Sequence, residues 1–198
     1  MLPTSTLLGG LHHRTNNDNS ILVHKLRRRS ATFTRTFREL EMDIMSSAPS
    51  QNDRYKAAWP THHSIDGQEA YAQFLEQFYA ISDTPGADDR WLEQFTADAT
   101  VIMASRSATG TDEILSLRKG MWVTVASRQH TPAQIFVFSS DASGAEIMLH
   151  GRVAYTFKSG GAGELPWAGR AHLVRSGEGI VRMSFYQVYF DTAAQKAS

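Results

Sequence analysis

The sequence contains no cysteine and no long apolar run, and each absence excludes a class of protein. Without cysteine, the 198-residue chain cannot form disulfides, offer a thiolate nucleophile or build a cysteine-ligated zinc site. No stretch approaches the roughly 20 apolar residues of a membrane-spanning helix. The lack of cysteine fits a reducing compartment. We therefore expect a cytoplasmic protein with no membrane association.

Sequence motifs for cofactors and metals are also missing. The chain has no glycine-rich dinucleotide or nucleotide-phosphate motif and no histidine pattern typical of a metal site. The glycines of residues 160–163 lie between expected strands rather than before a helix, so they indicate a loop and not a phosphate cradle. The pair His62-His63 is interpreted as solvated. We therefore expect no metal and no cofactor.

Charge divides the chain into two unlike segments. The whole sequence balances 20 Lys and Arg against 20 Asp and Glu, which does not favour nucleic acid or membrane as a partner. Residues 1–38 nevertheless carry seven basic residues and one acid. Residues 1–45 fit a transit peptide, a disordered tail, or sequence upstream of a true start at Met42 or Met45. A transit peptide would make the location mitochondrial. The cluster Arg27-Arg28-Arg29 is too short to indicate nucleic-acid binding.

From Pro60 onward the sequence has the patterning of one folded domain. Asp66 and Glu69 resemble a capping box, and an apolar helical face follows, which ends before Pro85-Gly86. This face consists of Tyr71, Phe74, Leu75, Phe78 and Tyr79. We expect a short helix at Asp88-Asp89, a strand over residues 99–104, a polar loop over 105–110, and a third helix capped by Thr111. We expect a tail at 1–59, a domain at 60–192 and a C-terminal tail at 193–198.

After Arg128 the period changes from helical to alternating, which predicts strands at about 129–139, 145–158, 167–175 and 180–191. Residues 145–158 are apolar on one face only, as in an antiparallel sheet covered by helices on one side. The last strand is apolar on both faces, with Met183, Phe185 and Tyr189 assigned to one face and Tyr186 to the other. Such a strand favours a homodimer through the sheet. The expected class is α+β.

Three motifs in this order resemble the nuclear transport factor 2-like proteins and, within them, the SnoaL-like family. They are FTADATVI at 95–102, GTDEILSLR at 110–118 and FYQVYFD at 185–191. The resemblance covers about residues 65–191. It implies a cone-shaped, curved antiparallel sheet wrapped around three helices, with a deep pocket inside the cone. It also implies a dimer in many cases. Polyketide cyclases, isomerases, dehydratases, epoxide hydrolases and non-catalytic binding proteins share this fold, so fold alone does not give function.

Comparison with the active sites of these proteins excludes two kinds of enzyme. The carboxylate of ketosteroid isomerases is replaced by Met103, which cannot accept a proton. The Arg-x-Asp element of limonene-epoxide hydrolases does not occur. Scytalone dehydratase is similar in the step Gln129-His130, although its second histidine corresponds to Tyr155 here.

The candidate catalytic residues follow from these comparisons and from the strand pattern. His130 is the expected acid or base, because imidazole takes up and returns protons near neutral pH. Tyr155 and Tyr79 are expected to donate hydrogen bonds to a substrate carbonyl, and Asp83 is expected to orient His130. A structural role for His130 remains an alternative. The outward-facing histidines, His150 and His172, are expected on the outer sheet surface. The expected substrate contacts are Trp122, Phe136, Phe78, Met103 and Tyr189.

The sequence therefore predicts a cofactor-independent lyase or isomerase that binds a hydrophobic small molecule. The resemblance implies dehydration, cyclisation or enol–keto isomerisation of an oxygenated polyketide or terpenoid intermediate of secondary metabolism. The alternative is a non-catalytic small-molecule-binding or dimerisation module on the same fold. A third alternative is a protein-interaction module that uses the exposed sheet.

Overall fold

The computed structural model describes residues 53–62, 64–191 and 193. The expectations for residues 1–52, including the basic cluster at 27–29, lie outside the described residues, as does His63. The elements are, in chain order, η1 (Asp53–Tyr55), α2 (Gln68–Ser82), α3 (Asp88–Leu92), β1 (Phe95–Met103), β2 (Arg106–Thr109), α4 (Gly110–Met121), β3 (Val125–Asp141), β4 (Gly144–Phe157), β5 (Ala162–Arg175) and β6 (Val181–Tyr189).

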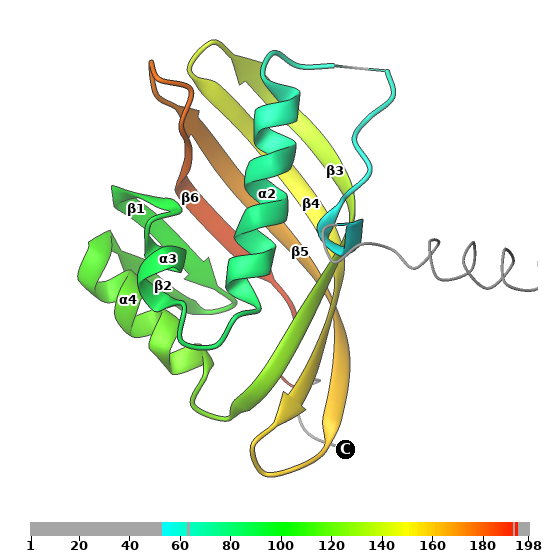
Figure 1. The fold of residues 1–198 in the computed structure, drawn as a ribbon, viewed down its shortest axis with the longest axis vertical. Coiled ribbons are helices and arrows are strands. Elements are labelled where there is room, and N and C mark those ends of the chain that lie inside the picture. Colours follow the sequence, from blue (N-terminus) through cyan, green and yellow to red (C-terminus); the bar gives the residue numbers. More distant parts are fainter. Residues whose placement is uncertain (1–52, 63, 192, 194–198) are drawn as a thin grey trace, which may run out of the picture. The chain divides into compact units, whose positions relative to one another are not determined.

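The strands form one six-stranded sheet in the order β2-β1-β6-β5-β4-β3. All neighbouring strands are antiparallel except β1 and β6, which run parallel. Helix α2 lies across one face of the curved sheet, while α3 and α4 lie beside β1 and β2 (Figure 1). This arrangement confirms the expected α+β class, with one parallel strand pair in the sheet.

Helix α2 buries the aromatic face that its sequence period predicts. All five residues of that face, from Tyr71 to Tyr79, are at most 8% exposed. The predicted capping box is wrong, because Gly67 is the N-cap in a left-handed conformation (φ 73°) and no side chain caps the helix. Asp66 instead forms an ion pair with Arg175 (Oδ2 to Nη2, 2.6 Å). A positive φ is readily available only to glycine, so Gly67 sets the start of the helix.

Several predicted boundaries differ from the structure because exposed strand residues resemble a loop in sequence. The expected loop at 105–110 contains strand β2, in which three of the four residues are polar and exposed. The N-cap of α4 is therefore Thr109 rather than Thr111. Strands β3 and β5 begin at Val125 and Ala162, earlier than their apolar patterns indicate.

A register shift in β6 changes which of its side chains face the core. His172 pairs with Phe185 and the next residue of β5, Leu173, pairs with Met183, so Ser184 is the extra residue of a bulge. Met183 and Tyr186 are consequently both buried, although simple alternation placed them on opposite faces. The predicted assignment of Met183 to the face of Phe185 and Tyr189 is therefore wrong.

Part of the segment before residue 60 pairs with the sheet. Ala58 forms a parallel bridge with Gln134 at a register shift in β3. The Ala58 amide donates to the Ala133 carbonyl (2.8 Å), and the Ile135 amide donates to the Ala58 carbonyl (2.9 Å). Two backbone hydrogen bonds therefore fix this segment against the sheet.

The C-terminal end of α2 is held by two buried arginines. Arg118 of α4 donates to the carbonyls of Ile81 (3.3 Å), Ser82 (2.9 Å) and Thr84 (3.0 Å). Arg128 of β3 also donates to the Ser82 carbonyl, through Nε (3.0 Å) and Nη2 (2.5 Å). Carbonyls at a helix end have no partner within the helix and carry partial negative charge, so cations stabilise them.

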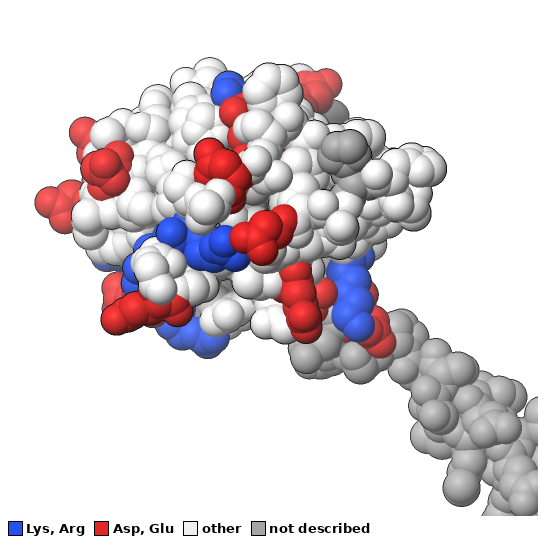
Figure 2. Space-filling model, turned by 90° about the horizontal axis from the view of Figure 1, so that it is seen from above, with Lys and Arg blue, Asp and Glu red and all other residues white. Residues whose placement is uncertain are grey.

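Charged side chains of both signs lie side by side on the face seen from above (Figure 2). This mixture agrees with the balanced composition. Among the described residues, none of the helices combines the length and the apolar character needed to cross a bilayer.

We predict that Arg118→Met lowers the free energy of unfolding by about 3 kcal/mol or more, because it leaves buried carbonyls and Asp88 without their partner. Denaturant titration of the full chain measures this. The matched control is Arg152→Met, which removes an exposed arginine paired with Glu164 and should change stability by at most about 0.5 kcal/mol. Equal effects of the two substitutions would show that Arg118 does not stabilise the end of α2.

Candidate active site

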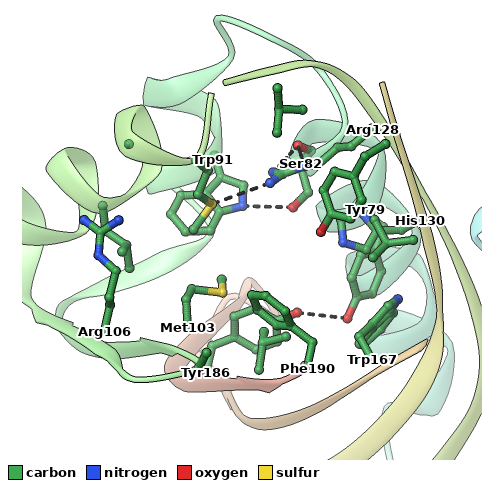
Figure 3. A pocket seen from close by; sticks show the side chains of 18 of the residues that line it. Tyr79, Ser82, Trp91, Met103, Arg106, Arg128, His130, Trp167, Tyr186 and Phe190 are labelled. Carbon is green, nitrogen blue, oxygen red and sulfur yellow. Dashed lines mark hydrogen bonds between the residues drawn. The ribbon is translucent and has the colours of Figure 1, made fainter. Parts of the chain in front are cut away.

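A cavity of about 350 Å³ opens between helices α2 and α4 and the sheet. Its deep end contains buried residues such as Tyr79, Trp167 and Tyr186, whereas Ser105, Arg106 and Thr124 are exposed and mark its mouth. Figure 3 shows His130 and Arg106 on opposite sides of this space. The apolar lining includes Phe78, Trp91, Met103, Leu117, Met121, Val125, Val153, Phe157, Val188 and Phe190. A space with apolar walls and a few polar groups is typical of a small-molecule site.

His130 and Asp83 form a hydrogen-bonded pair at the deep end. The His130 ring Nδ1 lies 2.5 Å from Asp83 Oδ1, and the His130 backbone amide donates to Asp83 Oδ2 (2.6 Å). One carboxylate therefore fixes both the backbone and the ring of the histidine. Because an ionised carboxylate only accepts hydrogen bonds, the neutral ring carries its hydrogen on Nδ1 and keeps the Nε2 lone pair for another partner. The expected contact between Asp83 and His130 is confirmed.

The surroundings of His130 favour its neutral form. Burial lowers the pKa of the imidazole below its ordinary value, and the charges of Arg128 and Arg118 lower it further. The hydrogen bond and the charge of Asp83 act in the opposite direction. A neutral imidazole with a free nitrogen lone pair acts as a base, so His130 is prepared to accept a proton at neutral pH.

Three tyrosines, Tyr79, Tyr155 and Tyr186, line the same cavity. The hydroxyls of Tyr79 and Tyr186 are 3.2 Å apart, and both side chains are buried. One hydrogen bond between two hydroxyls uses one hydrogen and leaves the other for a ligand. Burial raises the pKa of Tyr186 to about 12 and that of Tyr79 well above its ordinary value. Burial also raises the pKa of Tyr155, although Arg128 opposes this shift. All three hydroxyls are thus protonated donors at neutral pH.

Asp83 interacts with two further residues, Arg128 and Tyr55. Its carboxylate lies 3.7 Å from Arg128 Nε in an ion pair whose two side chains are both less than one tenth exposed. Burial, together with the charge of Asp83 and a hydrogen bond to it, raises the pKa of Tyr55 to about 12. Tyr55 belongs to η1, so a residue of the N-terminal segment contacts the carboxylate that orients His130.

The predicted substrate contacts separate into two groups. Phe78 and Met103 line the cavity as expected. Phe136 and Tyr189 do not, because they are 54% and 45% exposed on the opposite side of their strands. Trp122 is also outside the lining, since its ring packs against the guanidinium groups of Arg118 (5.2 Å) and Arg128 (4.8 Å). Phe136, Tyr189 and Trp122 are therefore not among the residues that line this cavity.

The two other histidines on the strands, His150 and His172, lie where the strand pattern predicts. His150 is exposed and lies 3.2 Å from Gln134 Oε1 through Nε2. His172 lies on the outer face near Glu146 (3.5 Å), which also pairs with Arg170. Within the described residues, no group of three or more His, Asp or Glu side chains is arranged to hold a metal ion.

Comparison with known proteins identifies the fold. No protein-family model matches the chain, and no curated protein sequence matches it significantly. Solved structures do match. Nuclear transport factor 2 from Cryptosporidium parvum shares 13% identity and a TM-score of 0.54, over 65% of this chain and 97% of that chain. The chain has a nuclear transport factor 2-like fold.

Two further structures with this fold are named after enzymes. A provisionally named scytalone dehydratase from Novosphingobium aromaticivorans has 14% identity and a TM-score of 0.57, over 63% of this chain and 83% of its own. A hexachlorocyclohexane dehydrochlorinase has 11% identity and a TM-score of 0.56, over 63% and 84%. At such identities the likeness establishes the nuclear transport factor 2-like fold alone.

Sequence reasoning missed several lining residues with polar or aromatic side chains, among them Arg128, Trp167, Tyr186 and Arg106. Arg128 lies two positions before His130, and alternation along a strand brings both to one face, so this signal was present in the sequence. Tyr186 lies after the bulge in β6, so alternation along the strand did not predict that it faces the cavity. The alternating pattern indicates a strand only from Trp167, although β5 begins five residues earlier.

We predict that His130 titrates below its ordinary pKa of 6.5, because burial and two arginines disfavour the imidazolium. Asp83→Asn should lower this pKa further, since the carboxylate is the group that raises it. Imidazole resonances followed by NMR during a pH titration measure both values. The unfolded chain binds this proton near pH 6.5 and the folded protein only at lower pH. Stability therefore falls as the pH decreases below 6.5. A rise of the His130 pKa in Asp83→Asn would contradict the assigned contact.

Proposed function

We propose that the protein is a cofactor-independent lyase or isomerase that removes a proton from carbon in a hydrophobic, oxygenated small molecule. The observation that carries this proposal is the His130–Asp83 pair at the deep end of a cavity lined by both apolar and polar side chains. A neutral imidazole oriented by a carboxylate is a general base. The two enzyme-named structures with the same fold support an elimination or dehydration class without identifying a substrate.

In such a reaction the His130–Asp83 pair transfers the proton, and the tyrosine hydroxyls stabilise the negative charge that develops. His130 Nε2 accepts the proton, and Asp83 stabilises the imidazolium that forms. As the carbon–hydrogen electron pair moves toward a carbonyl oxygen or a leaving group, negative charge develops there. Tyr155 and the free hydroxyl hydrogen of the Tyr79–Tyr186 pair are the donors for that charge. Return of the proton to another carbon completes an isomerisation, and transfer to a leaving hydroxyl completes a dehydration.

The alternative is a protein that binds such molecules without converting them. It uses the same apolar lining but gives His130 only a structural role, in which its hydrogen bond to Asp83 connects α2 to β3. The two functions differ in the reactivity of Nε2, which a probe substrate measures without knowledge of the natural one.

We predict that the protein accelerates the elimination reaction of a nitro-substituted benzisoxazole. In this reaction a base removes the ring proton from carbon, the nitrogen–oxygen bond breaks, and the electron pair passes to oxygen to give a coloured cyanophenolate. His130→Ala should reduce the rate at least about 100-fold, since a positioned base contributes on this scale. Asp83→Asn should reduce it less, because the base remains but loses its orientation. Absorbance of the product measures these rates.

The matched control is His150→Ala, which removes an exposed histidine from the outer face and should leave the rate unchanged. The rate should also fall at low pH with a midpoint below 6.5, in step with protonation of His130. Equal rates for wild type and His130→Ala, with both proteins binding the probe, would favour the non-catalytic alternative.

We also propose a homodimer formed through the outer face of the sheet. Phe136, Phe138 and Tyr189 are exposed there, and Phe138 reaches 77% exposure. Exposed aromatic residues of this size are typical of interaction surfaces.

The wild-type protein should have twice the 22.0 kDa chain mass in solution, and Phe138→Glu should convert it to monomer. Size-exclusion chromatography with light scattering measures both masses. Val123→Glu is the matched control, because Val123 is 69% exposed in the turn before β3 and lies outside this face. A monomeric wild type, or dissociation by both substitutions, would exclude this interface.

A further inference from the structure

The charged groups that line the cavity are all basic. Arg106 at the mouth and Arg128 in the wall are both lining residues, and none of the lining residues is an Asp or a Glu. The one nearby carboxylate in contact with this wall, Asp83, is already paired with His130 and Arg128. The cavity therefore presents positive charge to any molecule inside it.

Arg106 differs from the other arginines near the cavity because its charge is uncompensated. Arg118 and Arg128 have carboxylate and carbonyl partners. Arg106 has no ion pair or side-chain hydrogen bond with the part of the chain that the structure describes. Its guanidinium lies over Gly120 of α4, where both Nη atoms would be 3.5 Å from an added Cβ. The guanidinium therefore packs at ordinary contact distance on α4, at the edge of the opening.

We infer that the natural ligand is a ring compound with a carboxylate group, and that Arg106 binds this carboxylate at the mouth. This inference rests on the proposed function for the position of the reacting carbon, but not for the binding of the anion. The planar fork of a guanidinium matches a carboxylate through two parallel hydrogen bonds. Apolar lining such as Phe78, Met103 and Val188 surrounds the ring, and the reacting carbon lies toward His130, on the far side of the cavity from Arg106 (Figure 3).

The carboxylate also has a chemical reason to lie far from His130. A negative charge next to the imidazole would raise its pKa and favour the protonated form, which is inactive as a base. A carboxylate at the mouth is separated from His130 by the cavity and is solvated on one side. Such a ligand therefore gains recognition at Arg106 without changing the state of the base.

The test compares two probes of the same shape, naphthoate and naphthamide, which differ in the charge of one group. Isothermal titration calorimetry on the full chain at low salt measures their affinities. We expect naphthoate to bind at least about tenfold more tightly, consistent with one charge-assisted interaction. Arg106→Gln should remove most of this preference, and Arg106→Lys should retain part of it, since the charge remains without the fork. Higher salt should weaken naphthoate only.

The matched control is Lys119→Gln. It also removes one positive charge, at the residue of α4 next to Gly120, and Lys119 does not line the cavity. It should leave the preference for naphthoate unchanged. A shift of the Met103 methyl resonance on addition of naphthoate, assigned with Met103→Leu, verifies binding in the cavity.

Four outcomes would overturn the inference. They are equal affinity for the two probes, a preference that survives Arg106→Gln, an equal loss in Lys119→Gln, and absence of binding by either probe. Calorimetry involves no turnover, so an inactive His130 does not alter this result. Failure of the proposed lyase or isomerase function is read separately, from the benzisoxazole rate.

Discussion

The end of α2 is the point on which the site depends. A helix that ends inside a protein leaves carbonyls without partners, and here the guanidinium groups of Arg118 and Arg128 supply the missing donors. The next residue, Asp83, therefore has a fixed position, and it holds both the backbone amide and the ring of His130. The geometry of the candidate base thus follows from how one helix terminates. Trp122 contributes to the same arrangement by packing against both guanidinium groups.

Local patterns in the sequence predicted the parts of this structure that local physics controls. The period of α2 identified its buried face, and the alternation along β4 identified its two surfaces. The order of elements indicated the fold class. His130 and Asp83 could be proposed together because one follows a helix end and the other begins an alternating segment. The first two inferences need only a short window of sequence, whereas the fold class and the His130–Asp83 pair also used the resemblance over residues 65–191.

The parts that could not be predicted depend on contacts between distant segments. Buried arginines such as Arg118 resemble surface residues in sequence, since charge usually indicates exposure. Its burial is possible only because carbonyls 34 to 37 residues away, together with Asp88, compensate its charge. The bulge in β6 similarly depends on pairing with β5, so alternation alone placed Met183 on the wrong face. The exposure of Phe136 required knowledge of which face the helices cover.

Arg128 links the stability of the fold to the chemistry of the cavity. It closes the end of α2, forms an ion pair with Asp83, and lowers the pKa of His130 while it lines the cavity. A neutral residue at this position would remove one of the two arginine charges that oppose Asp83, and would therefore raise the pKa of the imidazole. Burial is the largest cause of the lowered pKa of His130, and the charges of the two arginines add to it against the opposite effect of Asp83. The stability of the fold and the protonation state of His130 thus depend on one set of buried charges.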